Sequence, residues 1–200
     1  LSTDRFFSMI EIYVIPEDIF SELAELFPSK YVHIGGDEVN TAQWMRCPDC
    51  KALMAREGLK DGEALQAYFM NRMSAIVEKY GKHPGVWNEA ARGNALPQGA
   101  LVYGWESVKA CQDATTKGYK TVVMPGEYFY FDMQQSPREG GHNWAGIFDA
   151  KKCYAFPQEQ PELMQNTDIE GFEATFWSEA YLSNRDLPYN FLHYQTFPRI

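Results

Sequence analysis

The sequence of 200 residues predicts an α/β fold in which helices alternate with the strands of a parallel sheet. Two features predict this fold. Five short apolar runs are each bounded by turn residues, as the buried strands of parallel sheets usually are. Longer segments between some of these runs carry apolar residues at helical spacing.

The composition is that of a folded globular chain, and it excludes two classes of partner. Hydrophobic residues make up 45% of the chain, charged residues make up 22%, and the net charge is −9. An acidic chain lacks the basic footprint that nucleic-acid binding requires. No apolar run approaches the roughly 20 residues needed to cross a bilayer. We therefore expect no nucleic-acid partner and no membrane span.

The five predicted strands come at irregular intervals along the chain. They cover residues 31–34, 85–87, 100–105, 121–124 and 172–177. Each is followed, at its end or shortly after it, by polar or aromatic residues. The spacing leaves two long insertions, one after the first strand and one after the fourth.

Three predicted helices lie among the strands. The first opens at Pro16, a residue favoured in the first helical turn, and carries an apolar stripe that includes Phe20. The second follows Asp61, which we expect to be its N-cap. The third covers residues 108–116 and ends before Gly118.

Residues 127–170 have weak periodicity and many aromatic, Gly and Gln residues. They predict a long, partly ordered loop. Loops of this length are more often functional than idle.

Of the four cysteines, Cys47 and Cys50 have the spacing of zinc and redox motifs. No second pair follows to complete four zinc ligands. A redox role would require the pair at the start of a helix in a thioredoxin-like unit. We expect instead a pair in a loop, either free or locally bridged.

Carboxylates and tryptophans follow the predicted strands. In a barrel of alternating strands and helices, the active site lies at the carboxyl ends of the strands. Aromatic faces stack on sugar rings, and carboxylates bind hydroxyls or transfer protons. The pattern favours a sugar site. Each tryptophan alone would more often be a core residue, and Glu89 and Glu106 could equally be salt-bridge partners.

The adjacent acids Asp37 and Glu38 are harder to explain as structural residues. They follow a predicted strand and two glycines, so that two like charges share one sharp turn. Gly35 and Gly36 allow a turn or a close approach to a ligand. A metal site would use His33 with the two acids, but the chain has four histidines and no close pair of them, so this alternative ranks lower.

These residues resemble a known family. The run from His33 to Glu38 is similar to the His-x-Gly-Gly-Asp-Glu signature of the family 20 glycoside hydrolases, the β-N-acetylhexosaminidases. Further similarities follow in the family's order, over a resemblance that extends from about Phe20 to about Arg185. They are Trp87-Asn88-Glu89, a strand ending in Trp105, Tyr130-Phe131-Asp132 and Trp177-Ser178-Glu179.

The resemblance implies a partial (β/α)8 TIM barrel, approximately strands four to eight with their helices. Residues 1–200 would then be a fragment of a single catalytic domain whose N-terminal strands are absent. The family's arginine at the end of the first barrel strand has no counterpart here, since it would precede Leu1. Asn88 stands where the family commonly has an acid.

The resemblance also implies an exo-acting β-N-acetylhexosaminidase with a substrate-assisted retaining mechanism. Glu38 would be the general acid and base, and Asp37 would orient the substrate's acetamide, which is the nucleophile. Tyr130 would donate its hydroxyl to the acetamide oxygen. The expected substrate-binding residues are His33, Trp44, Trp87, Trp105, Asp132, Trp144, Trp177 and Glu179.

We expect no cofactor and no metal. The implied partners are an oligosaccharide or glycoconjugate substrate and the missing N-terminal part of the same chain. The implied location is periplasmic, cell-surface or secreted, and the isolated fragment would be inactive. Two alternatives stay open: a non-catalytic carbohydrate-binding module that uses the same aromatic rim, and a metal-assisted hydrolase that uses His33 and Asp37.

Overall fold

The structure of the chain is a computed structural model that describes residues 11–93, 96–179 and 190–200. Five strands form one sheet in the order β1-β2-β3-β4-β5, which is also their order along the chain. The chain divides into two compact units, Leu1–Val102 and Tyr103–Ile200. The α/β prediction is confirmed.

Unit 1 is built on two parallel strands. Its elements are α1 (Glu11–Leu26), β1 (Tyr31–His33), α2 (Pro48–Glu57), α3 (Gly62–Lys79), β2 (His83–Trp87) and the 3-10 turn η1 (Asn88–Ala91), followed by β3 (Leu101–Gly104), which crosses into unit 2. In β1 and β2, Tyr31 lies opposite His83 and His33 lies opposite Gly85. The first three predicted strands are therefore confirmed to within two residues at each end.

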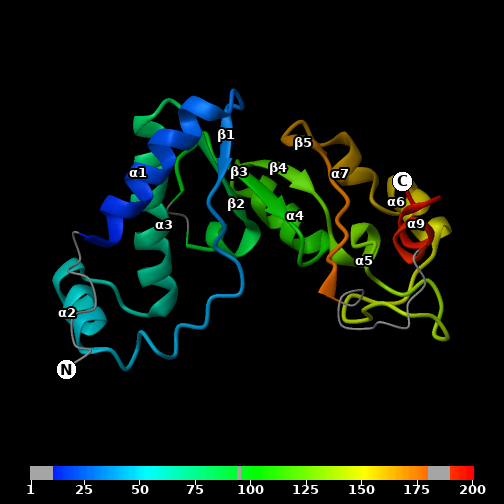
Figure 1. Cartoon of the computed structure of the whole chain (residues 1–200), viewed down its shortest axis with the longest axis horizontal. Helices are drawn as coiled ribbons and strands as arrows, with labels where there is room; N and C mark the ends of the chain where they lie inside the picture. Colours follow the sequence, from blue (N-terminus) through cyan, green and yellow to red (C-terminus); the bar gives the residue numbers. More distant parts are fainter. Residues whose placement is uncertain (1–10, 94–95, 180–189) are drawn as a thin grey trace. The chain divides into compact units, whose positions relative to one another are not determined.

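Helix α1 lies against α3 (Figure 1). The prediction that Pro16 opens this helix is wrong, because Pro16 lies inside α1. The helical turn before Pro16 packs against α3. The centre of the Tyr13 ring lies 5.9 Å from that of the Phe69 ring, and the central carbon of the Arg72 guanidinium lies 4.4 Å from the centre of the Tyr13 ring. These contacts with α3 offset the backbone hydrogen bond that a proline inside a helix removes.

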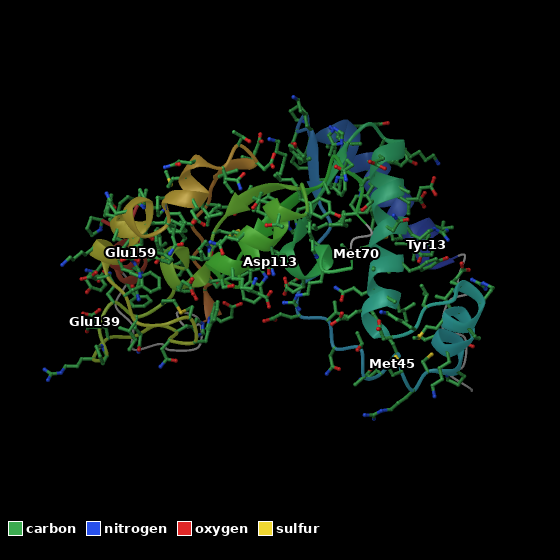
Figure 2. The ribbon with its side chains drawn as sticks, turned by 180° about the vertical axis from the view of Figure 1, so that it is seen from behind. Tyr13, Met45, Met70, Asp113, Glu139 and Glu159 are labelled. Carbon is green, nitrogen blue, oxygen red and sulfur yellow. The ribbon has the colours of Figure 1, made fainter. Side chains whose placement is uncertain are left out.

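Helix α3 begins as predicted at Asp61, whose side chain accepts a hydrogen bond from the Ala64 N–H at 2.8 Å. The hydrophobic cluster of α2 and α3 contains Leu53, Met54 and Leu65. Figure 2 shows Tyr13 and Met70 on the two packed helices of this unit.

Unit 2 contains the fourth and fifth strands. Its elements are α4 (Val108–Thr116), β4 (Lys120–Val123), α5 (Gly126–Phe129), α6 (Ala150–Glu159), α7 (Pro161–Gln165), β5 (Ile169–Phe172) and α9 (Phe191–Thr196). Helix α4 has the predicted bounds, with the Ser107 hydroxyl accepting the Ala110 N–H at 3.2 Å and Gly118 just beyond its end. Strands β4 and β5 pair in parallel.

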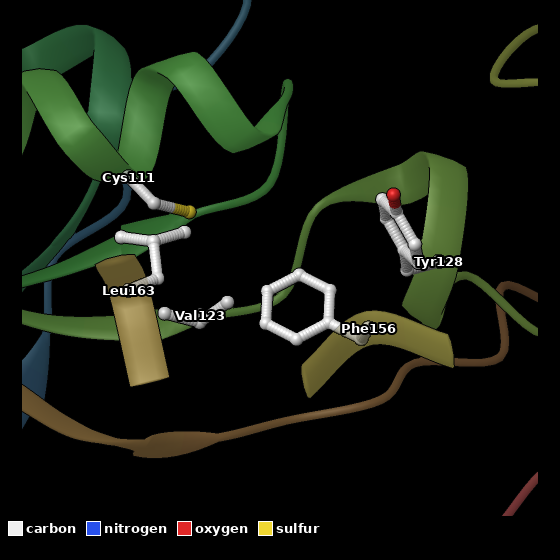
Figure 3. Packing of buried hydrophobic residues seen from close by; sticks show 5 residues of the cluster. All are labelled: Cys111, Val123, Tyr128, Phe156 and Leu163. Atoms are coloured by element: carbon white, nitrogen blue, oxygen red, sulfur yellow. The ribbon is translucent and has the colours of Figure 1, made fainter. Parts of the chain in front are cut away.

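The prediction of one long loop over residues 127–170 is wrong in part, because α5, α6 and α7 lie within or across it. These helices are short, and Pro157 lies inside α6, although a proline usually ends or kinks a helix. Packing stabilises them. Figure 3 shows Phe156 of α6 between Val123 and Tyr128, with the two aromatic rings 5.0 Å apart.

The predicted fifth strand is misplaced. The strand covers Ile169–Phe172 rather than residues 172–177. Its partner β4 ends at Val123 and α5 begins at Gly126, so the regular ladder has no partner to continue on. Beyond the end of β5, the chain still contacts residues 129 and 130. The Thr175 N–H donates to the Phe129 carbonyl at 2.9 Å, and an isolated β-bridge joins Thr175 to Tyr130.

Helix α1 leaves much of its apolar surface uncovered. Val14, Ile15, Ile19 and Leu26 are each about half exposed or more.

In the part of the chain that the structure describes, no helix combines the length and apolar character that crossing a membrane requires.

Candidate active site

The turn after β1 is tied to the neighbouring strand by backbone hydrogen bonds. The Ile34 N–H donates to the Gly85 carbonyl at 2.8 Å, and the Trp87 N–H donates to the Gly35 carbonyl at 3.0 Å. The Gly35 N–H donates to Nδ1 of His33 at 3.1 Å. The backbone leading to the two acids is thus held against β2 and by the side chain of His33.

Gly36 is required for two separate reasons. Its φ of +103° lies in the left-handed region, which side chains rarely adopt. A Cβ on it would also lie 2.8 Å from Cβ of Ala90 and 3.0 Å from Cε of Met70. Its carbonyl accepts a hydrogen bond from Nε2 of Gln66 on α3 at 2.8 Å. Gln66 is therefore part of the support of this turn, although nothing in the sequence distinguishes it from other polar residues of the helix.

Glu38 carries the clearest backbone strain in the described chain. Its φ is +49°, and no other described residue except glycine has a positive φ. Such a conformation costs about 1–2 kcal/mol and persists where the surroundings enforce it. One support is visible: the Glu38 N–H donates to Oε1 of Glu89, just after β2, at 3.2 Å. The carboxylates of Asp37 and Glu38 are both exposed on this turn.

His33 completes this group. Its ring lies 4.6 Å from the ring of Trp87. Desolvation by the surrounding protein atoms lowers the pKa of His33 to about 4, although part of the residue stays exposed, and the Asp37 carboxylate acts in the opposite direction. The hydrogen bond that Nδ1 accepts from Gly35 also requires this nitrogen to be unprotonated. His33 is therefore a neutral imidazole near pH 7.

Of the predicted site residues in unit 1, the structure brings His33, Asp37 and Trp87 close to the Glu38 turn. Trp44 lies in the turn before α2 and packs against the cluster of Leu53, Met54 and Leu65. At least part of its indole therefore serves the core, and its role as a platform for a sugar stays a prediction.

The cysteine pair does not lie in a loop as expected. Cys47 directly precedes α2, Cys50 is in its first turn, and both are free thiols. The backbone amide and the thiol of Cys50 lower the pKa of Cys47, whereas burial and the neighbouring sulfur raise the pKa of Cys50 to about 11.

In unit 2, four predicted site residues form one aromatic cluster around Tyr130. The Tyr130 ring lies 5.3 Å from that of Trp144, 6.1 Å from Trp105 and 6.3 Å from Trp177, and the rings of Trp105 and Trp144 are 5.7 Å apart. Tyr130 is buried, while Trp144 and Trp177 are about half exposed. The cluster therefore combines a buried tyrosine with two partly exposed tryptophans.

Asp132 lies beside this cluster and is almost fully buried, at 1% exposure. Its Oδ1 accepts a hydrogen bond from the Trp177 N–H at 3.4 Å, but its buried Oδ2 has no partner among the described residues. Burial raises the pKa of Asp132, and the nearby Glu179 carboxylate adds to this effect. A buried carboxylate oxygen without a donor is costly, and a hydroxyl donor placed beside it would remove this cost.

Sequence reasoning missed how the two acids are held in place. Glu89 stood out as part of the Trp87-Asn88-Glu89 motif and as a candidate salt-bridge partner, but its contact with the Glu38 N–H was not predicted. Gln66 escaped because a polar residue on a helix gives no sequence signal of a contact with a distant turn.

The chain is similar to known proteins over most of its length. The chain is 30% identical over 190 residues to a β-hexosaminidase of Vibrio furnissii. This match covers 91% of this chain and 30% of that protein. It is 32% identical over 196 residues to a β-hexosaminidase of Akkermansia muciniphila, which covers 94% of this chain and 38% of that protein. The chain thus spans less than two fifths of either relative.

The fold is similar to that of solved structures. An exo-β-N-acetylglucosaminidase from Vibrio harveyi, solved in complex with N-acetylglucosamine, superposes with a TM-score of 0.80 at 32% identity, over 94% of this chain and 29% of that one. The five strands and their helices are accordingly part of a (β/α)8 barrel. The family model for the catalytic domain of glycosyl hydrolase family 20 matches residues 3–200. The chain belongs to glycosyl hydrolase family 20.

Proposed function

We propose that this chain carries the catalytic residues of an exo-acting β-N-acetylhexosaminidase, which removes terminal N-acetylglucosamine or N-acetylgalactosamine from oligosaccharides or glycoconjugates. The observation that carries the proposal is the turn of Asp37 and Glu38. It presents two exposed acids on a backbone that is strained at Glu38 and held by Glu89 and Gln66. Strain of this kind is retained where a side chain must be presented in a fixed direction.

In the proposed reaction, Glu38 protonates the glycosidic oxygen as its bond to C1 breaks. The carbonyl oxygen of the substrate's 2-acetamido group forms a new bond to C1, which gives an oxazolinium ion. Asp37 accepts the acetamide N–H and stabilises the positive charge that develops. The Glu38 carboxylate then takes a proton from a water molecule that attacks C1. The acetamide is restored, and the product keeps its anomeric configuration.

The aromatic cluster of unit 2 and Asp132 suit the sugar in this reaction. Tyr130 donates its hydroxyl to the acetamide oxygen, and Trp87, Trp105 and Trp177 surround the acetamide and the sugar face. Asp132 and Glu179 accept the hydroxyls at C4 and C6, and Trp144 packs against C6. The unpartnered Oδ2 of Asp132 supports this role, because a sugar hydroxyl would supply the missing donor.

The test is hydrolysis by the full-length protein of two chromogenic substrates, an N-acetyl-β-glucosaminide and the matching β-glucoside, which lacks the acetamide. We expect release of the chromophore only from the first, because the nucleophile is absent from the second. Equal hydrolysis of both would contradict the substrate-assisted mechanism.

A binding measurement separates the enzyme from a non-catalytic sugar-binding module. An inhibitor that mimics the oxazoline should bind the full-length protein at least 100-fold more tightly than N-acetylglucosamine, because catalysts bind mimics of the transition state more tightly than they bind substrates or products, by about 10²-fold or more. Equal affinity for the two ligands would favour the binding module.

A further inference from the structure

Arg199 carries a positive charge into the interior of unit 2. It follows α9 and is 4% exposed. In the described part of the chain, all of its hydrogen bonds go to oxygen atoms of neutral groups. They are Nη2 to the Phe131 carbonyl at 2.5 Å, Nη1 to the Met133 carbonyl at 3.2 Å and to the Phe148 carbonyl at 3.5 Å, Nε to the Gln195 carbonyl at 2.7 Å, and Nη2 to Oε1 of Gln195 at 2.6 Å.

The guanidinium also lies against two aromatic rings. Its carbon is 4.9 Å from the centre of the Phe131 ring and 5.5 Å from that of Phe148. Burial lowers the pKa of Arg199, although an arginine stays charged near neutral pH. We call Arg199 and the four residues that accept its hydrogen bonds the Arg199 clamp.

The clamp holds the backbone on both sides of Asp132. Its forked donors reach the carbonyls of Phe131 and Met133, which are the two chain neighbours of Asp132. Tyr130 precedes the same short segment. The opposite edge of the segment is tied as well, since the Phe131 N–H donates to the Thr175 carbonyl at 2.7 Å and the Asp132 carbonyl accepts the His142 N–H at 2.8 Å.

A buried cation is a costly way to stabilise a fold. Taking a charge out of water is unfavourable, and apolar residues of similar volume often replace buried ionic groups without loss of stability. A planar fork of N–H groups does what an apolar side chain cannot: it fixes two carbonyls at a set separation. In this segment, the fixed residue between them has a buried carboxylate oxygen without a donor.

We propose that Arg199 is a positioning residue that sets the backbone of residues 131–133, so that Asp132 receives the sugar hydroxyl at C4. This inference rests on the proposed function. Loosening the fork displaces the buried carboxylate from the sugar. A misplacement of about 1 Å costs a site on the order of 100-fold in rate.

The experiment compares Arg199→Lys with the unchanged full-length protein. Lysine keeps the charge but lacks the fork. Arg72→Lys is the matched control, because Arg72 is exposed on α3 and contacts Tyr13 and Tyr68 rather than the site. Two substrates are used, a chromogenic N-acetyl-β-glucosaminide and its 4-deoxy analogue, and thermal midpoints are recorded so that rates are compared well below unfolding.

We expect Arg199→Lys to lower kcat/KM for the 4-hydroxy substrate by about 10- to 100-fold and to lower it much less for the 4-deoxy analogue. The reason is that the contact with Asp132 is already missing in the analogue. In an Asp132→Asn background, Arg199→Lys should add little to the loss. A fall that is equal for both substrates, or none beyond that of Arg72→Lys, would show that Arg199 serves only the fold.

A second variant covers the case in which Arg199→Lys does not fold. Gln195→Met removes the amide oxygen that accepts from Nη2 and leaves Arg199 in place. It should produce a smaller loss with the same dependence on the 4-hydroxyl, and the absence of that dependence would overturn the inference. The unchanged protein separates the two proposals. If it does not cleave the N-acetylglucosaminide, the proposed function is wrong. If it cleaves normally but the variants show no loss that depends on the 4-hydroxyl, only the positioning role of Arg199 is wrong.

Discussion

At the scale of single residues, the chemistry depends on backbone conformations that the side-chain pattern does not reveal. Glu38 is held at a φ of +49° while its N–H is bonded to Glu89. The two acids could be picked out from the sequence, because adjacent like charges after a strand are costly. The strain could not, since residues other than glycine rarely adopt this conformation.

The strain at Glu38 predicts a difference between two inactive variants. Glu38→Gly and Glu38→Ala both remove the acid, but only glycine adopts a positive φ without steric cost. We therefore expect Glu38→Gly to be more stable than Glu38→Ala by about 1 kcal/mol. Denaturant unfolding of the two full-length variants measures this difference, and a less stable glycine variant would mean that the turn is not strained.

At the scale of elements, predictability followed the strength of local signals. Helix α3 begins after its predicted N-cap Asp61, helix α4 ends before the predicted Gly118, and the structure confirms both helices. The short helices α5 to α7 depend on contacts between residues distant in sequence, such as that of Phe156 with Tyr128. For this reason the sequence pattern of residues 127–170 predicted a loop. The end of β5 depends on where its partner strand stops.

The start of α2 predicts an order of thiol reactivity. The pKa of Cys47 is lowered, so its reactive thiolate is present at a lower pH than that of an ordinary cysteine. Burial raises the pKa of Cys111 to about 12 and that of Cys153 to about 11. Together with the raised pKa of Cys50, this predicts that alkylation begins at Cys47 as the pH rises.

Peptide mapping after brief labelling with iodoacetamide at pH 6 to 9 measures this order. Cys47→Ser is the control and should remove the label that appears at the lowest pH. Labelling of Cys111 or Cys153 at the same pH as Cys47 would contradict the prediction.

At the scale of the whole molecule, the sequence predicted a parallel α/β sheet, and the relatives identify it as part of a barrel. The site residues lie in two groups along the chain, one in each unit. These candidates were chosen from motifs that follow the predicted strands, and their roles stay predictions. The residues that hold them, Gln66, Glu89 and Arg199, could not, because a hydrogen bond to a distant backbone leaves no pattern in a single sequence.

The length of the chain leads to an expectation about the isolated polypeptide. Five strands are fewer than the eight that close a barrel of this class, and several apolar side chains of α1 are exposed. We expect residues 1–200 alone to hydrolyse an N-acetylglucosaminide at less than about 1% of the rate of the full-length protein, since a site with displaced parts loses on the order of 100-fold. Comparable rates would show that these strands suffice.

The central claim, that Glu38 is the general acid, is tested most directly by the leaving-group dependence of Glu38→Gln. The full-length variant and a Glu78→Gln control, altered on the exposed face of α3, are assayed by kcat/KM on two N-acetylglucosaminides. One releases a sugar, which must be protonated, and the other releases dinitrophenolate, which needs no proton. A general acid contributes about 10²- to 10⁴-fold. If Glu38 is the general acid, Glu38→Gln loses activity by that factor on the first substrate and only slightly on the second. Equal losses for both substrates, or no loss at all, would contradict it.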